Sequence, residues 1–153
     1  MELDKTDKRI LGLLQRVGRL SNRELAAKVS LSPSPCWRRL KELESQGFIK
    51  GYAAMLDPEA LGLGVTAFTH VSLDNHHPAT LKEFHGAIMD CPEVLECHMT
   101  SGDHDYTLKV IAKDLASYQS FLSQRLMSVK GVRSVNSSFC LKQHKLTTAL
   151  PIE

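Results

Sequence analysis

The chain has 153 residues, of which 42% are hydrophobic and 24% are charged, as in an ordinary globular protein. No apolar run reaches the ~20 residues needed to cross a bilayer, and the first residues lack the pattern of a secretory signal, so we expect a cytoplasmic protein without a membrane segment. The four cysteines include no C-x-x-C pair. We expect reduced thiols, three of them packed as small hydrophobic residues.

The net charge of +2 is unevenly distributed along the chain. Residues 1–51 contain 11 lysines and arginines against 6 acidic residues, a net +5, whereas residues 52–153 contain 8 against 11, a net −3. All seven histidines lie in the second part. This asymmetry favours two modules, the first of which faces a polyanion, although a solvated basic surface would give the same counts.

The first part of the chain predicts three helices. Apolar residues at helical spacing predict a helix over residues 3–17, with Gly18 as its stop. The S-N-R-E pattern that begins at Ser21 has the form of a capping box and opens a short second helix. After a two-residue turn, Ser32 is expected to cap a third helix, with Pro33 in the first helical position.

The third helix is expected to bury Cys36, Leu40 and Leu43 on one stripe and to end at Gly47. Two short helices joined by a tight turn, after a first helix that completes the core, predict a helix-turn-helix. Residues 48–56 are expected to be extended, as a small wing or a linker strand.

The chemistry of the third helix is that of a DNA-recognition helix. Its basic residues lie away from the apolar stripe, and its first turn offers hydroxyls and exposed amides to phosphate. Trp37 is expected to pack at the edge of the core or the wing, and a solvated amphipathic helix is the alternative reading. The candidate DNA-binding residues are Ser21, Asn22, Arg23, Ser32, Ser34, Arg38, Arg39 and Lys41.

Beyond the glycines at 62 and 64 the pattern changes to alternating strands and helices. In chain order we expect a strand at 65–73, a helix at 79–89, strands at 94–101 and 105–111, a helix from 115 to 126 and a strand at 132–141. The order β-α-β-β-α-β is that of a ferredoxin-like sandwich, with two helices on one face of an antiparallel sheet. We expect the bare face to cover the sheet of another subunit.

The predicted fold class is therefore α+β. We expect residues 1–51 to form a (winged) helix-turn-helix DNA-binding domain, residues 52–64 a linker strand and hinge, and residues 65–153 a ferredoxin-like domain, for which the family resemblance given below implies effector binding and oligomerisation.

The turn from Thr100 to Tyr106 combines two carboxylates and an imidazole around a glycine. An amino-acid effector, the ligand class that the family resemblance given below implies, needs acceptors for its ammonium group, donors for its carboxylate and a pocket for its side chain. A Gly-Asp turn at a subunit interface can supply the first two, although such a turn is usually no more than a hairpin connection.

The segments L-D-K-T-D-K-R-I-L-G-L-L-Q, S-N-R-E-L-A-A-K-V, L-S-P-S-P-C-W-R-R-L-K-E-L-E-S-Q-G-F-I and S-G-D-H-D-Y resemble the Lrp/AsnC family, the feast/famine transcriptional regulators of bacteria and archaea. The similarity covers essentially the whole chain. It implies a homodimer that binds double-stranded DNA, commonly assembles into an octamer and senses an amino acid. The effector-binding residues that it implies are Thr100, Gly102, Asp103, His104 and Asp105, with Ser137, Ser138 and Phe139 from a neighbouring subunit.

The identity of the effector is left open by these residues. His104 stands where many relatives have an aromatic or other large residue. The C-terminal T-T-A-L-P-I resembles a subgroup for which leucine, methionine or cysteine are candidates. An alternative is a metal-responsive DNA-binding regulator that uses histidines such as His76 and His77, although they lack zinc spacing with the cysteines. No catalytic residue, metal site or cofactor is expected, because no motif places a nucleophile beside a histidine.

Overall fold

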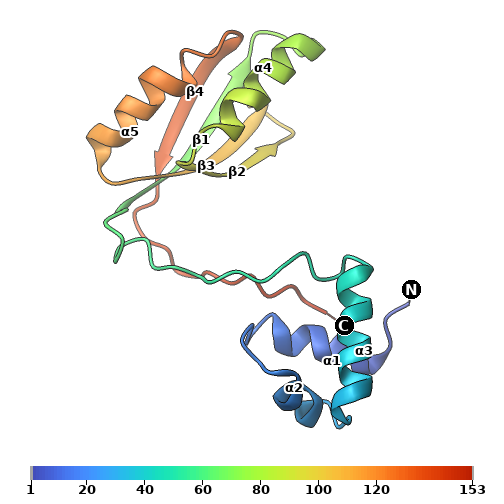
Figure 1. Ribbon diagram of the computed structural model, residues 1–153. Coiled ribbons are helices and arrows are strands. Elements are labelled where there is room, and N and C mark those ends of the chain that lie inside the picture. Colours follow the sequence, from blue (N-terminus) through green and yellow to red (C-terminus); the bar gives the residue numbers. More distant parts are fainter. Residues whose placement is uncertain (1, 153) are drawn as a thin grey trace. The chain divides into compact units, whose positions relative to one another are not determined.

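The computed structural model describes residues 2–152, which form two compact units. We call them the helical unit, made of the chain up to residue 55 together with the segment from residue 145 onward, and the sheet unit, made of residues 56–144 (Figure 1). Among the described residues, no helix is both long and apolar enough to cross a membrane.

The helical unit contains α1 (Lys5–Leu14), α2 (Asn22–Lys28) and α3 (Pro33–Ser45). A capping box opens each of the first two helices, at Asp4 for α1 and at Ser21 for α2. Capping side chains satisfy amides at the start of a helix that have no partner within it. The three helices enclose one core, whose buried residues are Ile10, Leu11, Leu14, Leu25, Ala26, Val29, Cys36, Leu40 and Leu43. The predicted stripe of α3 is confirmed.

The two ends of α3 differ in how they are capped. Ser32 occupies the N-cap position, but its side chain accepts no capping hydrogen bond, contrary to our prediction. Pro35 is the third helical residue, so the amide that a serine cap most often binds is missing. At the other end Gly47 has φ +77°, and its N–H donates to the Glu44 carbonyl while the Phe48 N–H donates to the Leu43 carbonyl. This Schellman arrangement stops the helix where predicted.

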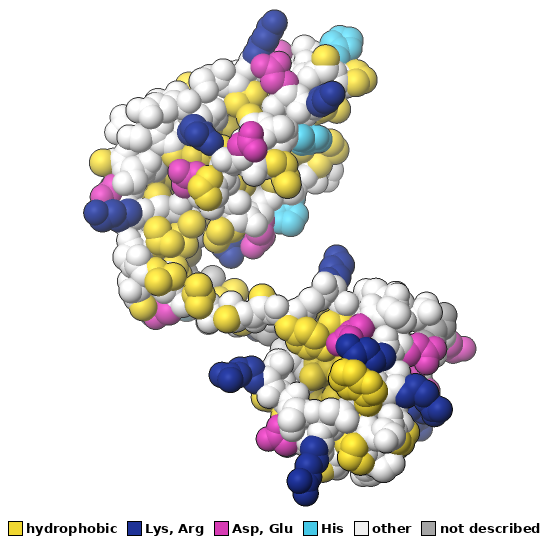
Figure 2. Space-filling view, in the orientation of Figure 1, with side chains coloured by type: hydrophobic (Ala, Val, Ile, Leu, Met, Phe, Trp, Pro, Cys, Tyr) yellow, Lys and Arg dark blue, Asp and Glu magenta, His cyan; other side chains and the backbone are white. Residues whose placement is uncertain are grey.

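The expected wing or linker strand is not formed. Residues 51–56 are exposed and belong to no strand, and hydrophobic side chains lie on the surface along this connection (Figure 2). A strand is stable only when its N–H and C=O groups pair with a neighbour, and no backbone hydrogen bond joins residues 51–56 to another described segment.

The C-terminal segment, which we expected in the second domain, contacts the helical unit through Gln15. The side-chain amide of Gln15 donates to the Leu150 carbonyl at 2.8 Å and accepts from the Leu150 N–H at 2.9 Å. An amide side chain carries one donor group and one acceptor, so it can pair with a backbone residue as a neighbouring strand would. Residues from 145 onward therefore lie with the helical unit.

The sheet unit has the predicted β-α-β-β-α-β order: β1 (Val65–Leu73), α4 (Pro78–Met89), β2 (Val94–Met99), β3 (Tyr106–Ala112), α5 (Leu115–Phe121) and β4 (Val132–Phe139). The strands form one antiparallel sheet in the order β2-β3-β1-β4. The predicted α+β class and ferredoxin-like topology are confirmed. The last turn after α5, Leu122–Leu126, is π-helical, which the sequence pattern did not predict.

Both helices cover the same face of the sheet (Figure 1). Their Phe84, Ile88, Tyr118 and Phe121 share one core with alternate residues of β1 and β3, and those of β3 are Tyr106, Leu108 and Val110. Strand neighbours point to opposite faces, so the intervening residues form the other face of the sheet. The described part of the chain has no helix on that face, which presents the half-exposed ring of Phe68 among mainly polar side chains.

Candidate functional sites

Polar residues from the candidate DNA-binding set hold the start of α2 and join it to the start of α3. The Ser21 N–H donates to the Glu24 carboxylate at 2.8 Å, and the Glu24 N–H donates to the Ser21 hydroxyl at 3.2 Å. The Asn22 amide donates to the Pro33 carbonyl at 2.9 Å, which joins the start of α2 to the start of α3. These bonds fix the angle at which α3 leaves the turn.

The three basic candidates on α3 have different surroundings. Arg39 Nη1 lies 2.7 Å from Asp4 Oδ2 and 2.8 Å from Asp7 Oδ1, and Asp7 is buried. Arg39 therefore joins α3 to α1. Arg38 is exposed and forms no ion pair among the described residues.

Lys41 lies in a chain of polar contacts along one flank of α3. Its Nζ is 2.7 Å from Glu44 Oε2 and 4.5 Å from the centroid of the Trp37 ring. The Tyr52 hydroxyl donates to Glu44 Oε1 at 3.0 Å. Partial burial and the Glu44 carboxylate raise the pKa of Tyr52 to about 12, so Tyr52 remains a donor at neutral pH.

The exposed candidates at the start of the two helices are Arg23, Ser32 and Ser34. With Arg38 and Lys41 they give the helix-turn-helix a surface of hydroxyls and cations. In the view of Figure 2, lysine and arginine side chains lie around the helical unit beside exposed hydrophobic ones, and the visible histidines lie on the sheet unit.

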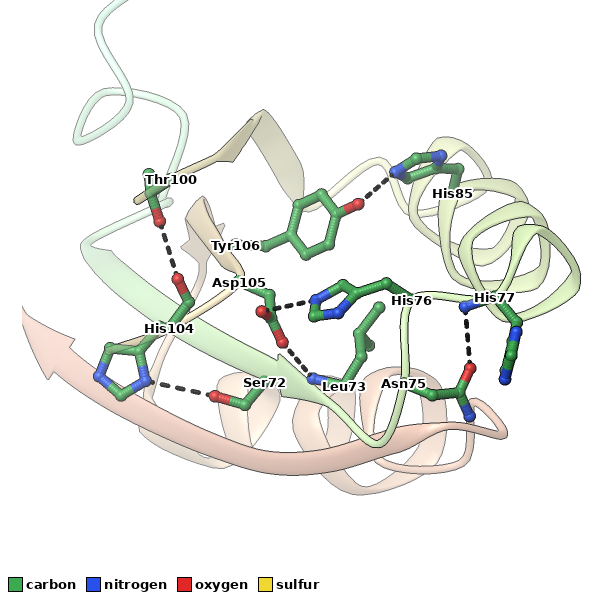
Figure 3. Close-up of polar contacts among 10 residues, drawn as sticks. All are labelled: Ser72, Leu73, Asn75, His76, His77, His85, Thr100, His104, Asp105 and Tyr106. Atoms are coloured by element: carbon green, nitrogen blue, oxygen red, sulfur yellow. Dashed lines mark hydrogen bonds and ion pairs between the residues drawn. The ribbon is translucent and has the colours of Figure 1, made fainter. Parts of the chain in front are cut away.

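Asp105 is the most connected residue of the turn between β2 and β3. Its Oδ2 accepts from the Leu73 N–H at 2.7 Å, and its Oδ1 lies 2.8 Å from His76 Nε2 (Figure 3). The Leu73 N–H, followed by His76, lowers the pKa of the Asp105 carboxyl, because both stabilise the carboxylate form. The turn thus carries a charged carboxylate in a fixed position at the end of β1.

The other residues of this turn make separate contacts. The Thr100 hydroxyl donates to the His104 carbonyl at 3.3 Å, and Gly102 has φ +117°, a conformation that glycine adopts without strain. Asp103 is exposed. His104 lies over the bare sheet face, where its ring stacks on His70 with centroids 5.0 Å apart and approaches the Ser72 hydroxyl at 3.5 Å.

The candidates on β4 do not meet this turn within one chain. Ser137 and Phe139 point toward the helices, where they contact Tyr118 through its hydroxyl and its ring. Ser138 pairs with Phe68 near the start of β1, whereas the Asp105 N–H donates to the Val71 carbonyl near its end. Within one chain, the candidates on β4 and those of the turn therefore lie toward opposite ends of β1.

Sequence reasoning missed a pocket of about 320 Å³ beside the turn. Its lining residues come from α4, β2 and the start of β3 and are mainly apolar or sulfur-containing: His85, Ile88, Met89, Cys97, Met99 and Tyr106. His85 Nε2 lies 2.9 Å from the Tyr106 hydroxyl (Figure 3). Met99 and Tyr106 lie next to Thr100 and Asp105 in the sequence, so the pocket adjoins the polar turn. Sequence analysis found the cluster M-T-S-G-D-H-D-Y, but it gave no sign that residues of α4 line a pocket beside it.

Within residues 2–152, no group of three or more histidine, cysteine, aspartate or glutamate side chains is arranged to hold a metal ion. His76, which sequence reasoning considered for metal binding, is paired with Asp105 instead. All four cysteines are free thiols; Cys36 and Cys91 are buried, Cys140 is half-buried and Cys97 is exposed.

Comparisons with known proteins identify both domains. A model for the Lrp/AsnC ligand binding domain matches residues 66–150, and a model for winged helix-turn-helix DNA-binding matches residues 3–50. The chain is 42% identical over 151 residues to the DNA-binding transcriptional activator DecR of Escherichia coli K12, with 99% of each chain covered. It is 44% identical over 151 residues to the Bkd operon transcriptional regulator of Pseudomonas aeruginosa PAO1, again with 99% of each covered.

A solved structure is also similar over nearly the whole chain. It is that of a transcriptional regulator from Neisseria meningitidis in complex with L-methionine, with a TM-score of 0.95 and 45% identity over 98% of this chain and 97% of that one. The relatives are transcriptional regulators rather than enzymes, and the resemblance seen in the sequence is confirmed. The chain belongs to the Lrp/AsnC family of DNA-binding transcriptional regulators, with a helix-turn-helix near its N-terminus and a ligand-binding domain after it.

Proposed function

We propose that this regulator acts in the cytoplasm as a homodimer, which assembles further into an octamer, and that an amino acid controls its binding to DNA. The bare sheet faces of two chains form the dimer contact, because an open sheet face with an exposed ring of Phe68 is stable when another layer covers it. Dimers carry two recognition helices, so we expect roughly palindromic sites with half-sites about one helical turn apart.

The DNA contacts that we propose come from α3, its N-cap and the start of α2. Arg38 and Lys41 contact base edges or phosphates, and Ser32, Ser34 and Arg23 position the helix on the backbone. Ser21 supports this surface by capping α2, Asn22 by its bond to the start of α3, and Arg39 by its contacts with α1. Arg38→Ala is expected to weaken DNA binding at least tenfold. Unchanged affinity in a fluorescence anisotropy titration would contradict the assignment of α3.

For the ligand, the observation that carries the proposal is the fixed Asp105 carboxylate beside an apolar, sulfur-lined pocket. A carboxylate pairs with the ammonium group of an amino acid, the amides of the Gly102 turn donate to its carboxylate, and the pocket takes its side chain. Methionine is our first candidate, because a relative with 45% identity has been solved with L-methionine. Leucine and cysteine are the next candidates. Ser137, Ser138 and Phe139 of a neighbouring subunit complete the site.

A thermal-shift screen of the amino acids against the full-length protein tests this ligand class. A ligand at 100 times its Kd stabilises the folded state by about 2.7 kcal/mol, a shift of several degrees. We expect methionine to raise the melting temperature and Asp105→Ala to abolish the effect. Asp74→Ala, at an exposed position just beyond β1, is the control and should keep the response. A response to Zn²⁺ or Ni²⁺ with none to any amino acid would favour a metal-responsive regulator instead.

A further inference from the structure

Trp37 is an exposed aromatic residue near the start of α3. It is the only tryptophan of the chain, and 49% of its surface is accessible. We expected it at the edge of the core or against a wing, but it is absent from the hydrophobic core of the helical unit and the wing strand is not formed. A large aromatic side chain gains most of its stabilisation from burial, so its exposure here needs another explanation.

The position of Trp37 on the helix places it among the proposed DNA contacts. Residues three and four apart are neighbours on a helix surface. Trp37 is therefore a neighbour of Ser34 on one side and of Lys41 on the other, and Arg38 is the neighbour of the same two residues. These four side chains form one continuous surface, whereas Arg39 points to the opposite flank, toward α1.

The indole ring is also held in place before any DNA is bound. Lys41 Nζ lies 4.5 Å from its centroid, and Lys41 is in turn anchored by Glu44, which accepts from Tyr52. A cation over an aromatic face is attracted by the ring's quadrupole. A side chain already ordered in the free protein loses less conformational entropy on binding.

We propose that Trp37 reads sequence by packing its indole ring against the 5-methyl group of thymine in the major groove. The thymine methyl is the apolar group that the major groove presents beside its hydrogen-bonding edges, and apolar side chains recognise it by contact. Arg38 and Lys41 beside it supply the attraction to phosphates or guanine that carries no thymine preference. This inference rests on α3 being the recognition helix and adds one specificity-determining residue to it.

The test begins with selection of preferred sites from random DNA by the full-length protein. Each thymine of a half-site is then replaced in turn by deoxyuridine, which removes only the methyl group. Burying one methyl group contributes about 0.8 kcal/mol, so wild-type affinity should fall about fourfold at one or two positions. Trp37→Ala should bind the thymine and deoxyuridine forms of those sites equally.

Control variants separate this role from general binding. Phe48→Ala removes another exposed aromatic ring, at the C-terminal end of the same helix, and should keep the fourfold preference for the methyl group. Arg38→Ala should weaken binding to the thymine and deoxyuridine forms alike and so keep their ratio. Trp37→Phe keeps an apolar ring and should retain part of the preference.

Intrinsic fluorescence gives a second measurement, because Trp37 is the only tryptophan. Acrylamide should quench it readily in the free protein and much less in the complex with a selected site. The proposal is overturned if wild-type affinity is insensitive to every thymine-to-deoxyuridine change, or if the free protein already shields Trp37, as it would when a partner subunit covers it. A wild-type protein that shows no salt-dependent DNA binding at all would refute the proposed function itself, which is a distinguishable result.

Discussion

Two adjacent arginines on α3 have different partners and so different expected roles. Arg39 pairs with Asp4 and with Asp7, which is buried, whereas Arg38 is exposed. Removing one partner of a buried charge leaves the other unpaired, and this costs more than the pair contributes when intact. Sequence analysis treated both arginines as DNA contacts, because they are adjacent and of the same residue type. Their different partners are visible only in the structure.

We predict that Arg39→Ala lowers the free energy of unfolding of the helical unit by roughly 1–2 kcal/mol, with a value at the low end because Arg39 is partly solvent-accessible. Trp37 fluorescence during denaturant unfolding measures this, since Trp37 belongs to the same unit. Arg38→Ala is the matched control and should leave the unfolding midpoint unchanged while it weakens DNA binding. Equal stability of the two variants would show that the contacts of Arg39 contribute nothing.

The Asp105 carboxylate predicts a dependence of stability on pH. Its pKa is lowered from 3.8 in the folded protein, mainly by the Leu73 N–H and then by His76. A carboxyl group with a lowered pKa binds its proton more weakly when folded, so its stabilising effect is full above the unfolded pKa and is lost as pH falls through the folded one. Asp105→Asn should therefore weaken the acid dependence of melting of the sheet unit below about pH 4.

Calorimetric melting between about pH 5 and pH 3 checks this dependence. Asp103→Asn serves as control, because the Asp103 side chain is exposed and makes no hydrogen bond among the described residues. The explanation fails if the Asp103 and Asp105 variants lose stability with acid at the same rate as the wild type.

At the scale of the elements, Gly131 and Gly86 have different surroundings, and alanine substitutions at the two positions should have opposite effects on stability. Gly131 precedes β4 with φ +94°, and a Cβ there would lie 2.5 Å from Thr80 Cγ2. Gly86 lies within α4, and a Cβ there would meet nothing within 4 Å. We expect Gly131→Ala to destabilise the sheet unit by roughly 1–3 kcal/mol, and Gly86→Ala to stabilise it by up to about 1 kcal/mol.

Urea unfolding of the two glycine variants tests this pair, with the slope against denaturant as a check that the unfolded state is unchanged. Unchanged or raised stability of Gly131→Ala would mean that the close approach of Thr80 and the positive φ are accommodated at little cost.

Most elements could be predicted because their signals are local. β1 was predicted to the residue, since its period-two pattern ends at turn residues on both sides. The prediction of a wing strand was wrong, because a strand forms only with a pairing partner, and a local stretch of sequence does not show whether that partner exists. The capping hydrogen bond expected at Ser32 is not formed, because Pro35 has no N–H at the position to which a serine cap usually bonds. The π-helical turn after α5 has no residue signal that we recognise.

The candidate sites were predictable only in part. Asp105 was found through its place in a glycine turn, but its bonds to Leu73 and His76 join residues about thirty positions apart. The apolar pocket joins α4 to β2 and could not be assembled from either segment alone. Trp37 was expected at the edge of the core or the wing because it follows the inward-facing Cys36, and helical spacing does not show what an exposed side chain contacts.

For the molecule as a whole, the contact between Gln15 and Leu150 ties the C-terminal segment to the helical unit. We predict that Gln15→Ala speeds hydrogen exchange of the Leu150 amide about tenfold, as expected for the loss of bonds that together contribute about 1.4 kcal/mol. Gln46→Ala, at an exposed amide after α3, is the control. Exchange at Leu150 that is equally fast in the wild type would mean that the segment is not held in solution.

This contact gives the helical unit a second stretch of chain. Because the segment from residue 145 onward lies with the helical unit, two covalent connections join the sheet unit to it, one before residue 56 and one after residue 144. A fragment that stops at residue 55 contains the whole helix-turn-helix match but lacks the contact between Gln15 and Leu150. A short protein that keeps this contact would join residue 55 to residue 145 through a flexible linker.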